Sequence, residues 1–214
     1  MKSRLAAFAL LTSLALAGSA RAADPLVGDA AAGQAKAAVC GACHGATGNS
    51  VNPAWPSLAG QHQGYIAEQL ALLKAGTRIA PVMQPMAATL SPQDMADLGA
   101  YFQSQTLVGL EANPAQWQAG EKLYRGGDAK RSVPACIGCH GPNGRGNGPA
   151  RWPQIRAQQP LYVAAQLKAY AAKTRYNPQG QPAPPAAADI MADVASRLSE
   201  ADITALAAYL QGLR

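Results

Sequence analysis

The sequence carries one five-residue pattern twice, as Cys40-Gly41-Ala42-Cys43-His44 and as Cys136-Ile137-Gly138-Cys139-His140. All four cysteines of the chain lie in these two stretches, together with two of its three histidines. C-x-x-C-H is the attachment signature of a c-type haem. Its spacing lets two thiols bond to the vinyl groups on one porphyrin edge while the adjacent histidine reaches the iron. The sequence therefore predicts two covalently bound haem c groups, with His44 and His140 as axial ligands.

Three other uses of paired cysteines explain the pattern less well. A zinc site built from two C-x-x-C pairs has them roughly 15–20 residues apart, whereas 92 residues separate Cys43 from Cys136. A thioredoxin-like dithiol needs one pair and no following histidine. Structural disulfides occur in exported proteins, but they leave the two histidines unexplained.

The first 22 residues are predicted to be a signal peptide. Lys2 and Arg4 form a basic start, Leu5–Ala17 is an apolar stretch of 13 residues, and Ala20-Arg21-Ala22 is a small-x-small cleavage site. An uncleaved anchor is the alternative, but the apolar stretch is short for one. Export fits the cofactor, because covalent haem attachment takes place outside the cytoplasm in organisms that secrete apocytochromes. We therefore expect cleavage after Ala22.

Charge is distributed unevenly along the chain. Of the 214 residues, 49% are hydrophobic and 14% charged, and without residues 1–22 the net charge is near +3. Residues 23–113 carry a net charge of −3, and residues 114–214 a net charge of +6. No segment beyond residue 22 approaches the roughly 18 apolar residues that span a membrane. This charge dipole predicts that partners recognise the two halves differently.

The second half of the chain repeats the first. In each half a Gly-rich loop follows the C-x-x-C-H motif, and an amphipathic helix with a serine N-cap and an acidic N3 residue closes the half. The recurring landmarks are Trp55 and Trp152, Tyr65 and Tyr162, Arg78 and Arg175, and the N-caps Ser91 and Ser199.

The repeat sets the expected architecture. No strand pattern of alternating residues persists, so we expect an all-α fold of two tandem domains. The predicted boundaries are residues 23–105 and 115–214, with a linker at residues 106–114. Each domain has fewer than 100 residues, and a domain of this size buries little surface by itself. A covalently held haem would supply much of each core.

The second axial ligand of each iron is assigned from the repeat. His62 is the one histidine outside the motifs, so two bis-histidine haems are excluded, and no cysteine remains for thiolate ligation. Methionine is then the natural ligand, through its soft thioether. Aligning Leu90 on Leu198 places Met83 opposite Met191, each seven residues before the leucine. Met83 and Met191 are therefore the predicted ligands.

Three further residues compete for this role. Met86 is the reserve candidate for the first haem. Met95 falls on the apolar face of a helix and is predicted to fill the core. His62 lies at a helix start, and its repeat partner is Gln159, which cannot mimic an iron ligand. We interpret His62 as a surface or capping histidine.

Groups around the haems also repeat. Pro56 and Pro153 lie 12 and 13 residues after His44 and His140, and their carbonyls are candidates to accept the Nδ1–H of the ligating imidazole. Three pairs are candidates to donate to haem propionates, with core packing or solvation as the alternative: Trp55 and Trp152, Tyr65 and Tyr162, and Arg78 and Arg175.

With these motifs in place, the chain after residue 22 resembles the dihaem cytochrome c4 family of tandem class I cytochrome c domains. The resemblance rests on both C-x-x-C-H motifs, on the stretch Pro56–Gln61, and on Met83 and Met191 with the helices that follow them. It implies His/Met ligation of both haems, proline carbonyls bonded to the ligating histidines, and a periplasmic location. An insertion of 11 residues within residues 176–190 departs from the family pattern.

The resemblance also implies packing and function. It predicts that Gly33 packs against Tyr101 and Gly120 against Tyr209. It implies an electron carrier rather than an enzyme, which takes single electrons from an upstream donor and delivers them to a terminal oxidase or reductase. No nucleic-acid partner is expected, and any membrane association would run through partner proteins.

Three alternatives to this function remain open. The chain would otherwise be the dihaem electron-accepting subunit of a dehydrogenase, such as a flavocytochrome c sulfide dehydrogenase. A small haem enzyme of the peroxidase kind needs an iron with an open or displaceable ligand, which the Met83–Met191 symmetry disfavours. A non-haem binding module is the weakest alternative.

Overall fold

The computed structural model of the protein describes residues 26–214, so the predicted signal peptide at residues 1–22 lies outside them. No β-strand occurs in this range, which confirms the all-α prediction, and none of its helices is long and apolar enough to cross a bilayer. The α-helices are α1 (Ala30–His44), α2 (Gln63–Lys74), α3 (Gln84–Ala88), α4 (Pro92–Ser104), α5 (Trp117–Gly126), α6 (Ile137–His140), α7 (Pro160–Ala171), α8 (Ala187–Ser196) and α9 (Glu200–Gly212). A short 3₁₀ helix, η1 (Ala129–Arg131), lies between α5 and α6.

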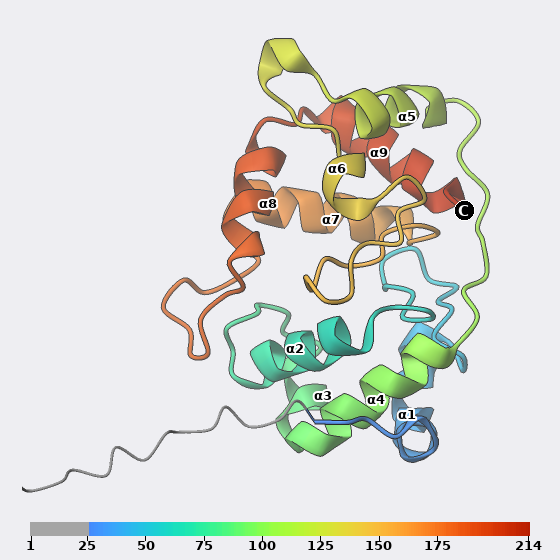
Figure 1. Cartoon of the computed structure of the whole chain (residues 1–214), viewed down its shortest axis with the longest axis vertical. Helices are drawn as coiled ribbons and strands as arrows, with labels where there is room; N and C mark the ends of the chain where they lie inside the picture. The colour runs from blue at the N-terminus through green and yellow to red at the C-terminus, as the bar shows by residue number, and fades with distance from the viewer. Residues whose placement is uncertain (1–25) are drawn as a thin grey trace, which may run out of the picture.

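The helices form two sets that follow the sequence repeat. Figure 1 shows α1–α4 in the lower part of the view and α5–α9 in the upper part, with the green segment after α4 running along one side between them. Residues 106–113 of this segment form no helix. The exact domain boundaries stay a prediction.

In each set, one glycine lets two helices cross at close range. A Cβ on Gly33 of α1 would lie 2.0 Å from the backbone O of Asp97 in α4 and 2.8 Å from Cβ of Tyr101. A Cβ on Gly120 of α5 would lie 2.7 Å from Cβ of Tyr209 in α9. Real Cβ atoms do not approach other atoms so closely, so only glycine fits at these crossings. Both glycine–tyrosine pairs are confirmed.

The helix that closes each half begins as predicted. Ser91 and Ser199 are the N-caps of α4 and α9, and each forms a complete capping box with the aspartate at N3. The apolar faces of these helices fill two cores. The first consists of Ala37, Ile66, Leu98, Tyr101 and Phe102, and the second is built around Leu123, Tyr124, Val163, Leu206 and Leu210.

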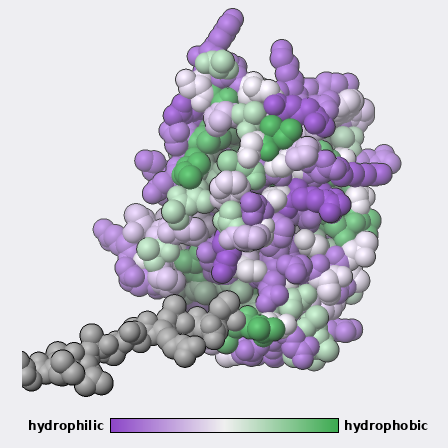
Figure 2. Space-filling model, in the orientation of Figure 1, coloured by the Kyte–Doolittle hydropathy of each residue, from purple (hydrophilic) through white to green (hydrophobic). Residues whose placement is uncertain are grey.

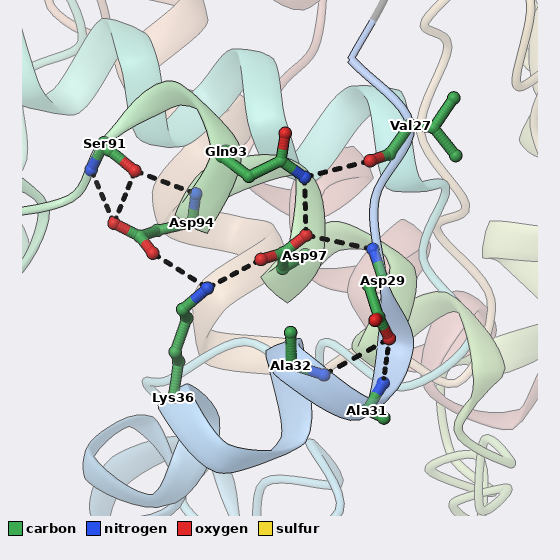
Figure 3. A network of polar contacts seen from close by, with 9 residues as sticks. All are labelled: Val27, Asp29, Ala31, Ala32, Lys36, Ser91, Gln93, Asp94 and Asp97. Carbon is green, nitrogen blue, oxygen red and sulfur yellow. Dashed lines mark hydrogen bonds and ion pairs between the residues drawn. The ribbon is translucent and has the colours of Figure 1, made fainter.

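A charged network ties α1 to α4 in the first half (Figure 3). Lys36 Nζ lies 2.8 Å from an oxygen of Asp94 and 2.6 Å from an oxygen of Asp97. The other oxygen of Asp97 accepts from the backbone N–H of Asp29 at 2.9 Å and from Nε2 of Gln93 at 2.8 Å. Asp97 is only 3% exposed, so these donors replace water around its carboxylate. At the repeat positions of Lys36 and Asp97 the second half has Leu123 and Ala205.

The network makes stability sensitive to acid. The Asp29 N–H, followed by Lys36 and Gln93, lowers the pKa of Asp97 to about 2, and Lys36 lowers that of Asp94. Both carboxyls have folded pKa values below their unfolded ones, so their stabilisation is present above the unfolded pKa, about pH 4. It is lost as the pH falls through the folded pKa values.

We therefore predict that Asp97→Asn makes the haem-loaded protein less stable at pH 7 and flattens the decline in melting temperature between about pH 4 and pH 2. The measurement is thermal unfolding followed by circular dichroism from pH 7 to pH 2. Glu111→Gln, in the exposed connecting segment, removes a carboxylate outside the network and should keep the wild-type profile. The same flattening in both variants would contradict a specific role of Asp97.

Candidate haem sites and the junction between them

The two motif histidines have matching environments. His44 ends α1 and is 6% exposed, and His140 ends α6 and is 8% exposed. Nδ1 of His44 lies 2.8 Å from the carbonyl oxygen of Pro56, and Nδ1 of His140 lies 3.0 Å from that of Pro153. A carbonyl only accepts, so each Nδ1 must carry the proton and donate. Each Nε2 then keeps its lone pair for a metal, as in ligating histidines generally.

The charge state of both imidazoles favours ligation. Burial, with a smaller effect of the nearby Arg78 charge, lowers the pKa of His44. Burial lowers the pKa of His140 as well, against the hydrogen bond to Pro153. A metal takes up the neutral imidazole, so both rings are in the required form at neutral pH.

The cysteines lie beside these histidines. Cys40 and Cys43 lie in the last turns of α1, and Cys136 is the N-cap of α6, which contains Cys139. The two cysteines of each pair are three positions apart. Burial raises the pKa of the Cys40 and Cys136 thiols. Cys40 and Cys136 pack against the two apolar cores, whereas Cys139 is exposed.

The three methionines of the first half differ in position and exposure. Met83 is half-buried at the N-cap of α3. Met86, the reserve candidate, lies within α3 and is 51% exposed, whereas Met95 is 4% exposed in the core, as predicted. Of the two ligand candidates, the structure therefore favours Met83.

The second methionine lies in a different local structure. Met191 is half-buried within α8, which begins at Ala187, four residues before it. In the first half, α3 begins only after Met83. The 11-residue insertion precedes this longer helix. Met191, which follows the insertion, therefore lies inside a helix, whereas Met83 lies at the start of one.

Two glutamines join the halves in a reciprocal way. Gln61 of the first half accepts from the backbone N–H of Gln154 at 2.9 Å and donates to its carbonyl oxygen at 2.9 Å. Gln158 of the second half accepts from the N–H of Ser57 at 2.7 Å and donates to its carbonyl oxygen at 3.0 Å. Gln61 matches Gln158 in the repeat, and Ser57 matches Gln154. The junction therefore has an approximate twofold symmetry.

Arginines and tyrosines cross the junction with the same symmetry. Nη2 of Arg78 donates to the hydroxyl of Tyr162 at 3.0 Å, and Nη2 of Arg175 donates to that of Tyr65 at 3.3 Å. Arg175 is 4% exposed, and its Nε and Nη1 have no hydrogen-bond partner within residues 26–214. Neither arginine has a carboxylate partner in that range. A buried guanidinium is costly without an anion, so Arg175 fits a haem propionate.

The other propionate candidates are less specific. Trp55 is 38% exposed and Trp152 is half-buried. Burial raises the pKa of Tyr65 to about 12, which keeps this phenol neutral and able to donate. The arginine and tyrosine pairs thus fit propionates better than the tryptophans do.

The insertion in the second half contacts the first half. The backbone N–H of Asn177 donates to the carbonyl oxygen of Thr77 at 2.7 Å, and the hydroxyl of Thr77 donates to the carbonyl oxygen of Pro182 at 2.8 Å. Thr77 is fully buried. Tyr176, just before the insertion, packs against Leu72 of α2 and donates to Gln69 at 3.1 Å. This segment therefore holds the two halves together.

The cytochrome c family model matches the chain in two segments, residues 30–106 and 118–214. The fold, the two C-x-x-C-H motifs and this double match define a c-type cytochrome with two covalently bound haem c groups.

Similar proteins and structures indicate which family of c-type cytochromes the chain belongs to. Cytochrome c4 of Azotobacter vinelandii is 46% identical over 95% of this chain and 96% of its own length. The crystal structure of reduced recombinant cytochrome c4 from Pseudomonas stutzeri superposes with a TM-score of 0.81 at 44% identity, covering 88% of this chain and all of that one. A thiosulfate dehydrogenase electron acceptor of Stutzerimonas stutzeri (strain A1501) is 34% identical over 81% of this chain and 78% of its own. The chain belongs to the cytochrome c4 family, and it is an electron-transfer protein rather than an enzyme.

Gln61 and Gln158 are functional residues of the junction that the sequence motifs did not predict. Both follow the tryptophan–proline pair of their half by the same interval, and that recurrence was the available signal. His62 makes no side-chain cap to α2; its Nε2 instead donates across the junction to the carbonyl oxygen of Arg145 at 2.8 Å.

We predict that Gln158→Ala lowers the free energy of unfolding by about 2–4 kcal/mol, because it leaves the buried N–H and C=O of Ser57 without partners. The measurement is denaturant unfolding of the haem-loaded protein. Gln118→Ala, on the exposed face of α5, deletes the same amide outside the junction and should change stability by less than about 0.5 kcal/mol. Equal effects in the two variants would contradict the assignment.

Proposed function

We propose that this dihaem cytochrome works in the periplasm and passes single electrons to a terminal oxidase or reductase. The observation that carries the proposal is the pairing of two equivalent histidine–proline sites across one reciprocal polar junction. Such a pairing suits a carrier that holds two redox centres in a constant relative position.

We assign His44 and Met83 as axial ligands of the first haem, and His140 and Met191 as those of the second. Cys40, Cys43, Cys136 and Cys139 would form the thioether bonds. Support comes from the free Nε2 of both histidines, from the half-buried state of both methionines, and from the family membership.

The protein side chains tune and shield these centres. When bound, haem iron supplies reversible one-electron exchange between its ferric and ferrous forms. Pro56 and Pro153 orient the imidazoles and raise their basicity. Arg175, which is buried, and Arg78, which is partly buried, would neutralise propionate charge at the junction. A thioether ligand opposite histidine raises the reduction potential.

The surface suggests how partners are recognised. Figure 2 shows hydrophilic side chains over most of the visible face, with hydrophobic ones in small, separate groups. Several basic residues of the second half are exposed and form no ion pair within the described range, among them Lys122 and Lys130. We infer that this half docks on an acidic surface, while the first half receives electrons.

A second candidate function rests on relatives that are named as electron acceptors of a thiosulfate dehydrogenase. The protein from Stutzerimonas stutzeri is named as the electron acceptor of a thiosulfate dehydrogenase, and this chain would then accept electrons from such an enzyme. Mixing the oxidised protein with a thiosulfate dehydrogenase and thiosulfate tests this. Reduction that needs the enzyme supports the second function, and the absence of reduction contradicts it.

The ligand assignment predicts that Met83→Ala removes the methionine-to-iron charge-transfer band from one haem and lowers that haem's reduction potential. Met191→Ala should do the same for the other haem. The measurements are visible spectroscopy of the oxidised protein and a redox titration. Met86→Ala is the matched control and should leave both signals unchanged. Loss of the band in Met86→Ala, with retention in Met83→Ala, would reverse the assignment.

The docking inference predicts that transfer to an acidic oxidase or reductase slows as ionic strength rises, because exposed charges further apart than about 8 Å are screened at 0.15 M salt. Lys122→Gln combined with Lys130→Gln should slow transfer a few-fold at low salt. Lys74→Gln on α2 of the first half should have a smaller effect. Rates that do not respond to ionic strength would rule out charge-guided docking.

A further inference from the structure

A cavity lies at the junction, beside the segment that connects the halves. Its volume is about 360 Å³. The first half contributes His62 and Gln103, and the second contributes Arg145, Gln154 and Arg156. None of these residues is a predicted haem ligand or a candidate propionate donor.

Two arginines line the cavity, Arg145 and Arg156, and no acidic side chain of the described residues does. Neither Arg145 nor Arg156 forms an ion pair within residues 26–214. Arg145 and Arg156 line the same cavity, and burial, followed by the charge of Arg145, lowers the pKa of Arg156. An anion bound between the two arginines would offset the repulsion between their charges.

Neighbouring contacts position the side chain of Arg156 and the backbone of Arg145. Nε of Arg156 donates to Oε1 of Gln154 at 3.1 Å, which leaves both Nη atoms available as donors. Nε2 of His62 donates to the backbone carbonyl oxygen of Arg145 at 2.8 Å, and the side chain of Arg145 is exposed. Gln103 uses its Oε1 to accept from the N–H of Gln63 at 2.8 Å, and its amide nitrogen stays available as a donor.

We propose that this cavity is a binding site for one small tetrahedral oxyanion, such as sulfate or phosphate. Guanidinium groups match the geometry of such an anion through paired N–H donors. Arg145 and Arg156 bind the anion, and Gln103 donates to it from the other half. His62 is a positioning residue. A bound anion therefore bridges the two halves at the edge of their junction.

Equilibrium dialysis of the oxidised, haem-loaded protein with radiolabelled sulfate tests the proposal, with ionic strength held constant by sodium chloride. We expect saturable binding of one sulfate per chain, displaced by unlabelled phosphate. Arg145→Gln and Arg156→Gln should each weaken binding about tenfold or more, as expected for the loss of a charge-assisted contact. Arg156→Lys keeps the charge but loses the paired donors, and it should bind with intermediate affinity.

The control removes one positive charge elsewhere. Lys122 lies on the exposed face of α5, and Lys122→Gln should bind sulfate with wild-type affinity. The haem absorption spectrum checks that every variant is folded, and Arg145 is exposed, so its replacement should not disturb folding. Binding that does not saturate, or that weakens equally in Lys122→Gln and in the arginine variants, would overturn the proposal.

Discussion

Side chains of each half satisfy buried backbone groups of the other half, next to the two prolines that contact the motif histidines. Gln61 and Gln158 each pair with both polar backbone groups of one residue across the junction, so neither half can bury this surface alone without a loss. Leaving a buried N–H or C=O unpaired costs about 1–3 kcal/mol. The prolines that orient the two histidines lie next to these paired residues, and the junction therefore helps to determine the geometry of both haem sites.

The two halves share a plan but differ in charge. In the first half, Lys36 joins two carboxylates that hold α1 on α4. In the second half, the corresponding contact is apolar, and Asp202 of the capping box pairs with Arg131 instead. Within residues 26–214, the second half has several arginines without an ion pair, whereas Arg78 is the one such arginine of the first half. Equivalent cofactors thus lie in unequal electrostatic surroundings, which favours unequal reduction potentials.

Local periodicity and the repeat predicted the helical fold and the capped helices, and the family resemblance predicted the two glycine crossings. The choice of Met83 over Met86 also follows from the repeat and stays a prediction. The sequence did not predict the junction. Gln61 contacts a residue 93 positions away and Ser57 one 101 positions away, and such contacts leave no periodic pattern in the chain. The role of Arg175 was left open between solvent and propionate for the same reason. Its burial, with Nε and Nη1 lacking a hydrogen-bond partner within residues 26–214, is the structural observation that favours a propionate.

The approximate twofold symmetry of the junction has an evolutionary consequence. In a symmetric homodimer, each contact between residue i of one subunit and residue j of the other occurs twice, related by the twofold axis. The paired contacts at the junction follow the same rule. Joining two copies of a one-haem ancestor through a short connection would make that pairing independent of protein concentration. It would also free each copy to diverge, and the Pro-rich insertion over Thr77 is a change that only one copy acquired. In this light the chain is a covalent dimer whose two subunits have begun to specialise.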